Sequence, residues 1–83
     1  MLNINEIRDK NSLTLELEGR LDTTTSPVLQ ELLEKNYPVI TELIFDFAKV
    51  DYMSSSGLRV LLMAQKAMED KGGILVQIGR AHV

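Results

Sequence analysis

The sequence of 83 residues contains no cysteine and no tryptophan, and its single histidine is His82. The lack of cysteine excludes disulfide bonds, thiolate metal sites and thiol nucleophiles, and a lone histidine offers no pair for a histidine-based metal site. No apolar run approaches the roughly 18 residues that span a bilayer. Nine basic and twelve acidic residues form no block, which argues against a nucleic-acid partner. The composition predicts one small cytoplasmic domain without a membrane segment, metal ion or cofactor.

Hydrophobic periodicity predicts four strands. Apolar and polar side chains alternate over residues 2–7 and 13–18, which is typical of a hairpin whose strands have one exposed face. Residues 43–47 are apolar except for Asp46, so we expect a central strand covered by helices on both faces. The last strand is expected at residues 74–78.

Two amphipathic helices are predicted between these strands. The first begins near Pro27, after capping hydroxyls at residues 23–26, and runs for about ten residues. The second covers residues 58–71, after three serines and Gly57, and ends at a Gly-Gly pair. The order β-β-α-β-α-β predicts an α/β fold with a mixed four-stranded sheet and right-handed crossovers.

No pattern in the sequence predicts catalysis. A Gly-rich phosphate-binding loop is absent, and the Gly-Gly pair follows a helix instead of opening one. A serine nucleophile would need His82, next to the last residue of the chain. The spacing of Asp22, Asp46 and Asp51 selects no acid and base. We therefore expect that the protein is not an enzyme.

Three serines, Ser54, Ser55 and Ser56, directly precede the second predicted helix. One interpretation is an N-cap, in which a hydroxyl accepts a hydrogen bond from the first turn and adds about 1 kcal/mol of stability. The other is a phosphorylation switch, because the free N–H groups and the helix dipole favour a dianion at this position. A phosphoserine would add roughly −1.5 to −2 charges to a chain of net charge −3.

Two leucines of the second helix, Leu58 and Leu62, fall within its polar side, one turn apart and next to the serines. One interpretation is that they pack against the first helix or against a segment C-terminal to this chain. The other is an apolar patch for a reversible protein contact, with Arg59 as a charge at its edge.

A series of motifs in fixed order covers nearly the whole chain. It consists of Gly19-Arg20-Leu21-Asp22, the Pro-initiated helix, residues 43–53 and the run Ser54-Ser55-Ser56-Gly57-Leu58-Arg59-Val60-Leu61-Leu62. Together these motifs resemble the STAS domain of bacterial anti-sigma factor antagonists. The resemblance implies a STAS fold and a partner that is both an anti-sigma factor and a Ser/Thr kinase. In that family, binding to the partner frees a sigma factor, and phosphorylation of the antagonist cancels binding, so the resemblance implies the same for this chain.

The resemblance also implies roles for single residues. The phosphoacceptor position falls on Ser55, with Ser54 and Ser56 as alternatives because many family members have Asp where this chain has Ser54. Asp22 and Asp46 match acidic positions near the phosphoacceptor loop. Asp46 would orient the serines, act on the kinase's metal-bound nucleotide or accept hydrogen bonds from backbone N–H groups. The expected partner-binding residues are Asp22, Asp46, Ser54, Ser56, Gly57, Leu58, Arg59 and Leu62.

Two functions follow as hypotheses. The first is a phosphorylation-switched antagonist that sequesters an anti-sigma factor kinase and so activates transcription. The alternative is a constitutive STAS scaffold subunit of a lipid-transport or stress-sensing assembly, in which the serines only cap a helix. Both leave a homodimer open, and neither involves direct contact with nucleic acid or a membrane.

The resemblance changes the interpretation of the chain length. STAS domains usually continue past the last predicted strand into another helix, so residues 1–83 are expected to be a STAS domain truncated before its C-terminal helix. Residues 78–83, Ile-Gly-Arg-Ala-His-Val, are also what a common sequencing adapter encodes in frame (ATC GGA AGA GCA CAC GTC). This correspondence predicts a non-native tail.

Overall fold

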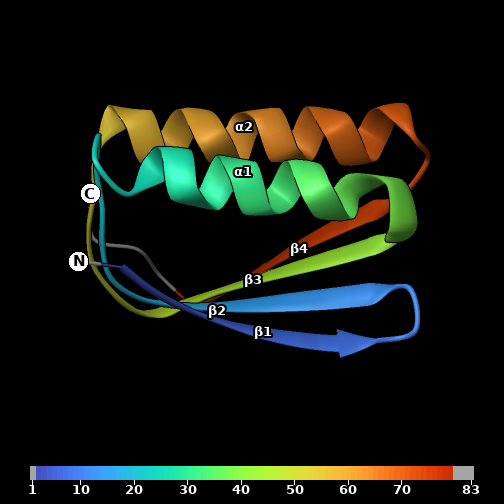
Figure 1. Ribbon diagram of the computed structural model, residues 1–83, viewed down its shortest axis with the longest axis horizontal. Coiled ribbons are helices and arrows are strands. Elements are labelled where there is room, and N and C mark those ends of the chain that lie inside the picture. Colours follow the sequence, from blue (N-terminus) through green and yellow to red (C-terminus); the bar gives the residue numbers. More distant parts are fainter. Residues whose placement is uncertain (1, 80–83) are drawn as a thin grey trace.

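The computed structural model describes residues 2–79, and the elements of this part of the chain follow the predicted order (Figure 1). They are β1 (Leu2–Asp9), β2 (Ser12–Leu21), α1 (Ser26–Asn36), the short 3-10 helix η1 (Tyr37–Val39), β3 (Glu42–Met53), α2 (Ser55–Asp70) and β4 (Ile74–Ile78). The predicted α/β fold with a β-β-α-β-α-β order is confirmed. His82 and most of the tail predicted to be non-native lie outside the described residues.

The strands form one mixed sheet in the order β1-β2-β3-β4. β1 is antiparallel to β2 and places Leu2 opposite Gly19, whereas β3 is parallel to both β2 and β4. The chain therefore passes from β2 to β3 and from β3 to β4 by two crossovers, which contain α1 and α2. Both crossovers step in the same direction across the sheet.

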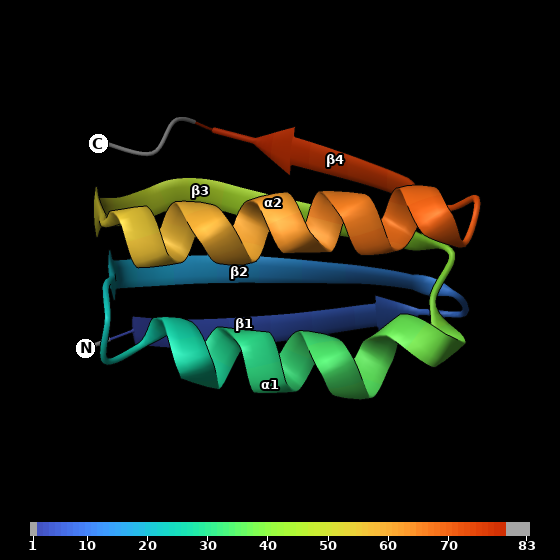
Figure 2. The same ribbon diagram turned by 90° about the horizontal axis from the view of Figure 1, so that it is seen from above.

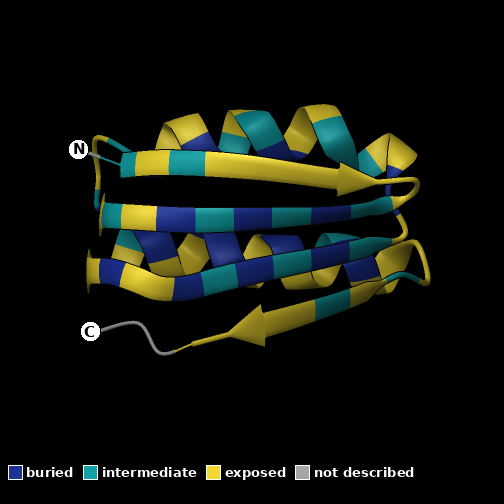
Figure 3. Ribbon diagram, turned by 90° about the horizontal axis from the view of Figure 1, so that it is seen from below, coloured by how far each residue is buried: buried dark blue, intermediate teal, exposed yellow. Residues whose placement is uncertain are grey.

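The two helices lie on the same face of the sheet (Figures 1 and 2). The expectation that helices cover both faces of the central strand is wrong, because two right-handed crossovers that step in one direction put both helices on one side. Leu43, Phe45 and Phe47 of β3 are at most 3% exposed under the helices. Ile44 and Asp46, which alternate with them, are only half-buried and point to the other side. We call that side, which neither helix covers, the open face (Figure 3).

The apolar core fills the space between the covered face of the sheet and the helices. In β2 every second side chain from Leu13 to Leu17 is buried, and in β3 the rings of Phe45 and Phe47 stack with 5.5 Å between their centroids. The helices complete this core with Leu29, Leu33, Val60, Leu61, Ala64 and Met68. The central strands β2 and β3 thus each bury one face, as period-two alternation predicts, whereas the edge strands β1 and β4 contain no fully buried residue.

β3 is longer than the strand predicted at residues 43–47. The pairing register with β2 shifts between Glu16 and Glu18 and again between Gly19 and Arg20, and each shift inserts one extra residue in β3. Such a bulge changes which side chains face the core, so the buried residues Val50 and Met53 do not continue the alternation. The longer strand ends at the first turn of α2, where the serines lie.

Candidate functional site

Several of the predicted site residues meet at the carboxyl ends of β2 and β3. The last pair of these parallel strands joins Leu21 to Met53, and the Ser54 N–H donates a hydrogen bond of 2.9 Å to the Leu21 carbonyl oxygen. The loops that lead into α1 and α2 begin here, side by side (Figure 1). Asp22 and residues 54–56 therefore share one edge of the sheet, which we call the serine edge.

The three serines have different environments. Ser54 is the N-cap of α2, and its Oγ accepts a hydrogen bond of 3.4 Å from the Gly57 N–H. Ser55 is the first residue of the helix and is exposed, whereas Ser56 is half-buried. The N-cap interpretation is thus confirmed for Ser54, and the cap does not use the Ser55 hydroxyl.

An exposed stripe runs along α2 from Ser55. Residues three and seven positions apart lie on one side of an α-helix, and Leu58 and Leu62 have this spacing from Ser55. Leu58 is 47% exposed and Leu62 is 58% exposed. Gln65 continues the same side and lines a cavity with β4, so this side points away from α1. The interpretation that these leucines pack against the first helix is therefore wrong, and we call Ser55, Leu58 and Leu62 the serine stripe.

The side of α2 that faces α1 borders a groove. The groove has a volume of about 330 Å³, and its lining residues are Thr23, Ser26, Pro27, Gln30, Ser56, Arg59, Val60 and Met63. Met63 is 49% exposed and was not among the predicted site residues, because only the position of α1 reveals that it borders a groove. Ser56 thus lies on the side of the helix that faces α1. Arg59 also lines the groove, but it follows Ser55 by four residues, so it lies between the groove and the serine stripe.

Gly57 is buried at the start of α2. A Cβ atom on this glycine would lie 2.7 Å from Leu21 Cγ and 3.0 Å from the Leu21 carbonyl oxygen, closer than Cβ atoms pack. The structure therefore places this expected partner-binding residue in an internal contact, where it allows α2 to approach β2.

A hydrogen-bonded loop fixes the Asp22 carboxylate at the serine edge. Its Oδ1 accepts hydrogen bonds from the Thr24 hydroxyl at 2.7 Å, the Thr24 N–H at 3.0 Å and the Thr25 N–H at 3.2 Å. These bonds, first those from Thr24, lower the pKa of Asp22 to about 2 and keep its side chain ionised at neutral pH. Thr25, at the N-cap position of α1, makes no side-chain capping bond. The hydroxyls of Thr24 and Thr25, which the sequence predicts as caps, instead donate hydrogen bonds within this loop.

Arg20 and Tyr52 form an exposed pair beside this loop that sequence reasoning missed. The guanidinium carbon of Arg20 lies 4.4 Å from the centroid of the Tyr52 ring, and Arg20 Nε lies 3.7 Å from Asp22 Oδ2. Arg20 belongs to the motif that includes Asp22, but only the pairing of β2 with β3 reveals its contact with Tyr52. The pair adds a cation and an aromatic ring to the serine edge.

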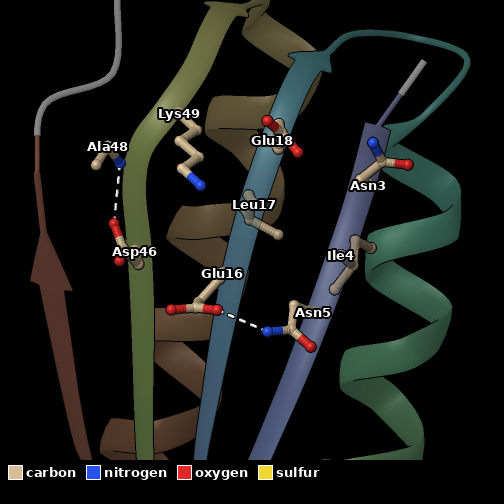
Figure 4. Close-up of a pocket in the computed structure, with 9 residues that line it drawn as sticks. All are labelled: Asn3, Ile4, Asn5, Glu16, Leu17, Glu18, Asp46, Ala48 and Lys49. Atoms are coloured by element: carbon tan, nitrogen blue, oxygen red, sulfur yellow. Dashed lines mark hydrogen bonds between the residues drawn. The ribbon is translucent and has the colours of Figure 1, made fainter.

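Asp46 does not lie at the serine edge. It occupies the open face in the middle of β3, opposite Glu16 and Ile78, and its Oδ1 accepts a hydrogen bond of 2.9 Å from the Ala48 N–H (Figure 4). A strand rises about 3.3 Å per residue, so roughly 20 Å of β3 separate Asp46 from its carboxyl end. Of the roles considered for Asp46, the structure contains the hydrogen bond from a backbone N–H group. This N–H group belongs to a bulge of β3 and not to the serine loop.

The described part of the chain offers no obvious metal site or membrane span. Within residues 2–79, no group of three His, Cys, Asp or Glu side chains is arranged to bind a metal ion. Neither α1 nor α2 has the length and apolar character that crossing a membrane requires.

Known proteins share this fold. A family model described as "Mlab, STAS domain" matches residues 4–81. The structure of the anti-sigma factor antagonist SpoIIAA in its unphosphorylated form is similar, with a TM-score of 0.85 and 17% identity over 99% of this chain and 76% of that chain. A search of curated proteins finds no match.

Two further solved structures have the same fold. The Bacillus cell fate determinant SpoIIAA in its phosphorylated form has a TM-score of 0.78 and 18% identity, over 90% of this chain and 68% of that chain. An anti-sigma factor antagonist from Mycobacterium paratuberculosis has a TM-score of 0.81 and 19% identity, over 98% of this chain and 71% of that chain.

Proposed function

This chain belongs to the STAS domain family, and we propose that it acts in the bacterial cytoplasm as an antagonist of an anti-sigma factor. It binds an anti-sigma factor that is also a Ser kinase, and binding releases a sigma factor to activate transcription. Phosphorylation of Ser55 cancels this binding. The observation that supports the proposal is the exposed serine stripe, in which a hydroxyl and two leucines share one side of α2.

The position of Ser55 suits a reversible switch. Because Ser54 supplies the N-cap, a kinase has access to the Ser55 hydroxyl without disturbing the cap. A phosphate at the N-terminus of α2 is compatible with the helix dipole, so the helix stays folded after modification. The dianion would stand one turn from Leu58, where its hydration opposes burial of the leucines in an interface.

Phosphorylation in vitro tests the switch. Incubation of the purified chain with the candidate anti-sigma factor kinase and Mg-ATP should add one phosphate, which tandem mass spectrometry should locate on Ser55. Ser55→Ala should abolish the modification, whereas Ser56→Ala, on the side of the helix that borders the α1 groove, should leave it intact. A kinase that modifies none of Ser54, Ser55 and Ser56 would refute the proposal.

Binding to the same kinase tests the stripe. Ser55→Asp and the pair Leu58→Thr and Leu62→Thr should each raise the Kd about tenfold or more, while Ser55→Ala keeps the wild-type Kd. Met63→Thr removes a similarly exposed side chain from the α1-facing side of α2 and should have little effect. Equal Kd values for Ser55→Asp and Ser55→Ala would count against a switch.

A second candidate is a constitutive STAS scaffold subunit, as in a lipid-transport or stress-sensing assembly. The family model, whose description names Mlab, favours it, and the N-cap contact of Ser54 is compatible with both functions. In this function Leu58 and Leu62 hold a partner permanently. Partner binding would then be insensitive to Ser55→Asp and still sensitive to the leucine substitutions.

A further inference from the structure

An apolar row crosses the open face of the sheet, which neither helix covers (Figure 3). The strand register aligns Ile7 of β1, Thr14 of β2, Ile44 of β3 and Val76 of β4. Ile7 is 47% exposed and Val76 is 39% exposed. At the β4 end the row is widened by two further exposed residues on the same face, Ile74 and Ile78. Thr14 and Ile44, in the middle of the row, are half-buried. Exposed apolar side chains that share one face of a sheet mark an interaction surface.

Carboxylates border the apolar row on both sides. The next row along the strands contains Asp9 and Glu42 in one direction, and Glu16 and Asp46 in the other. Neither of these two rows includes a basic residue. Rows on one face of a sheet are two residues apart, so each acidic row lies roughly 7 Å from the apolar row.

Hydrogen bonds orient three of these four carboxylates. Glu42 accepts from the Ser12 hydroxyl at 2.7 Å, and Glu16 accepts from the Asn5 amide at 2.6 Å. Together with the contact from Ala48 to Asp46, each bond engages one oxygen of its carboxylate (Figure 4). The other oxygen is left for a partner's cation.

The alternation of acidic, apolar and acidic rows determines which partner fits. Two open faces of this protein would bring like charges together, and anionic lipids or nucleic acids would be repelled. The apolar row spans three interstrand spacings, roughly 14 Å, which matches nine to ten residues of an α-helix. The acidic rows are separated by a similar distance, which accommodates a helix with its side chains.

We propose that the open face binds an amphipathic helix of a partner protein, with the apolar side of that helix on the row and Lys or Arg on both of its flanks. The helix adds a third layer to the two-layer domain. This surface lies on the other face of the sheet from the serine stripe. The domain therefore has room for this helix and for the partner of α2 at the same time.

Titration with a synthetic peptide tests this surface. The probe is an 18-residue helical peptide with leucines on one side and lysines on both flanks. Matched controls are a peptide with glutamate in place of lysine and a scrambled peptide of the same composition. Amide NMR shifts should occur at Ile7, Thr14, Ile44 and Val76 with the lysine peptide alone, and binding should weaken with salt.

Variants of the protein make the test specific. Ile7→Thr with Val76→Thr keeps β-branched side chains at exposed positions and should raise the Kd for the peptide about tenfold. Glu42→Gln with Asp46→Asn should raise it and flatten the salt dependence. The control, Leu58→Thr with Leu62→Thr, should leave the Kd unchanged, and each spectrum reports whether the variant is folded.

Four outcomes would overturn the inference: shifts confined to α2, equal binding of the glutamate peptide, an unchanged Kd in both sets of open-face variants, or sedimentation that shows self-association lost in Ile7→Thr with Val76→Thr. None of them bears on phosphorylation of Ser55. The two proposals therefore fail independently.

Discussion

The two faces of the sheet are built from the same strands and have opposite environments. In β2 the side chains of Leu13, Leu15 and Leu17 are at most 2% exposed beneath the helices, whereas Thr14 and Glu16, which alternate with them, stay half-buried on the open face. The backbone and its hydrogen bonds are common to both sets. Because the helices remove water from one side only, stability is concentrated on the covered face, and the open face is available for recognition.

A pair of neighbouring substitutions gives the largest expected contrast between the faces. Leu15→Ala empties a fully buried position and should lower the free energy of unfolding by about 2 to 5 kcal/mol. Thr14→Ala, one residue away on the open face, should lower it by less than about 1 kcal/mol. Urea denaturation of both variants measures the difference. Similar losses would mean that the open face is covered in solution.

The second prediction concerns how closely α2 lies against the covered face. Gly57→Ala would place a Cβ atom 2.7 Å from Leu21 Cγ and should cost about 1 to 3 kcal/mol of stability. Leu21→Ala alone should also destabilise, but the two losses should not add, because removing the leucine side chain relieves part of the clash. A double-mutant cycle in urea measures this coupling, and strict additivity would contradict the contact.

Two adjacent serines extend the comparison to the edge of the sheet. Ser54→Ala removes the cap of α2 and should cost about 1 kcal/mol, whereas Ser55→Ala should change stability by less than about 0.5 kcal/mol. Thermal melting of the two variants shows which substitution lowers the stability more. A larger loss for Ser55→Ala would mean that the exposed hydroxyl has a structural role and would weaken its assignment to a switch.

The smallest expected effect is a pH dependence at Asp22. Its pKa of about 2 in the folded protein lies below the ordinary value of 3.8, so its contribution to stability is complete above about pH 4 and is lost as the pH falls through 2. Asp22→Asn should therefore show a shallower loss of stability between pH 4 and pH 2 than the wild type. Carboxyl NMR titration of Thr24→Ala provides the complementary test, because removing the hydroxyl should raise the pKa of Asp22.

Particular residues show how far sequence reasoning reaches. The alternation around Leu15, the Pro27 helix start and the serines before α2 were sufficient for the element order and for the family. The same reasoning failed for the full length of β3, because two bulges interrupt the period on which it depends. It also failed to separate Asp22 from Asp46, since both carboxylates are close to strands in the sequence.

In the candidate site, too, some features follow from the sequence and others only from the tertiary structure. The spacing of Ser55, Leu58 and Leu62 is a property of one helix, so their common side follows from the sequence once the helix is assigned. That this side points away from α1, and that Arg20 contacts Tyr52, depends on how separate elements are placed. Contacts between separate elements leave no pattern in the sequence near the residues that make them.

The sequence by itself determined the kinds of elements and their order and placed capping serines before α2, because periodicity, turn residues and capping act within a few residues of the chain. Only the tertiary structure decided that both helices share one face, that Asp46 lies far from the serines and that Ile7, Ile44 and Val76 form one row. These features depend on the direction of the crossovers and on the register between strands that are distant in the sequence.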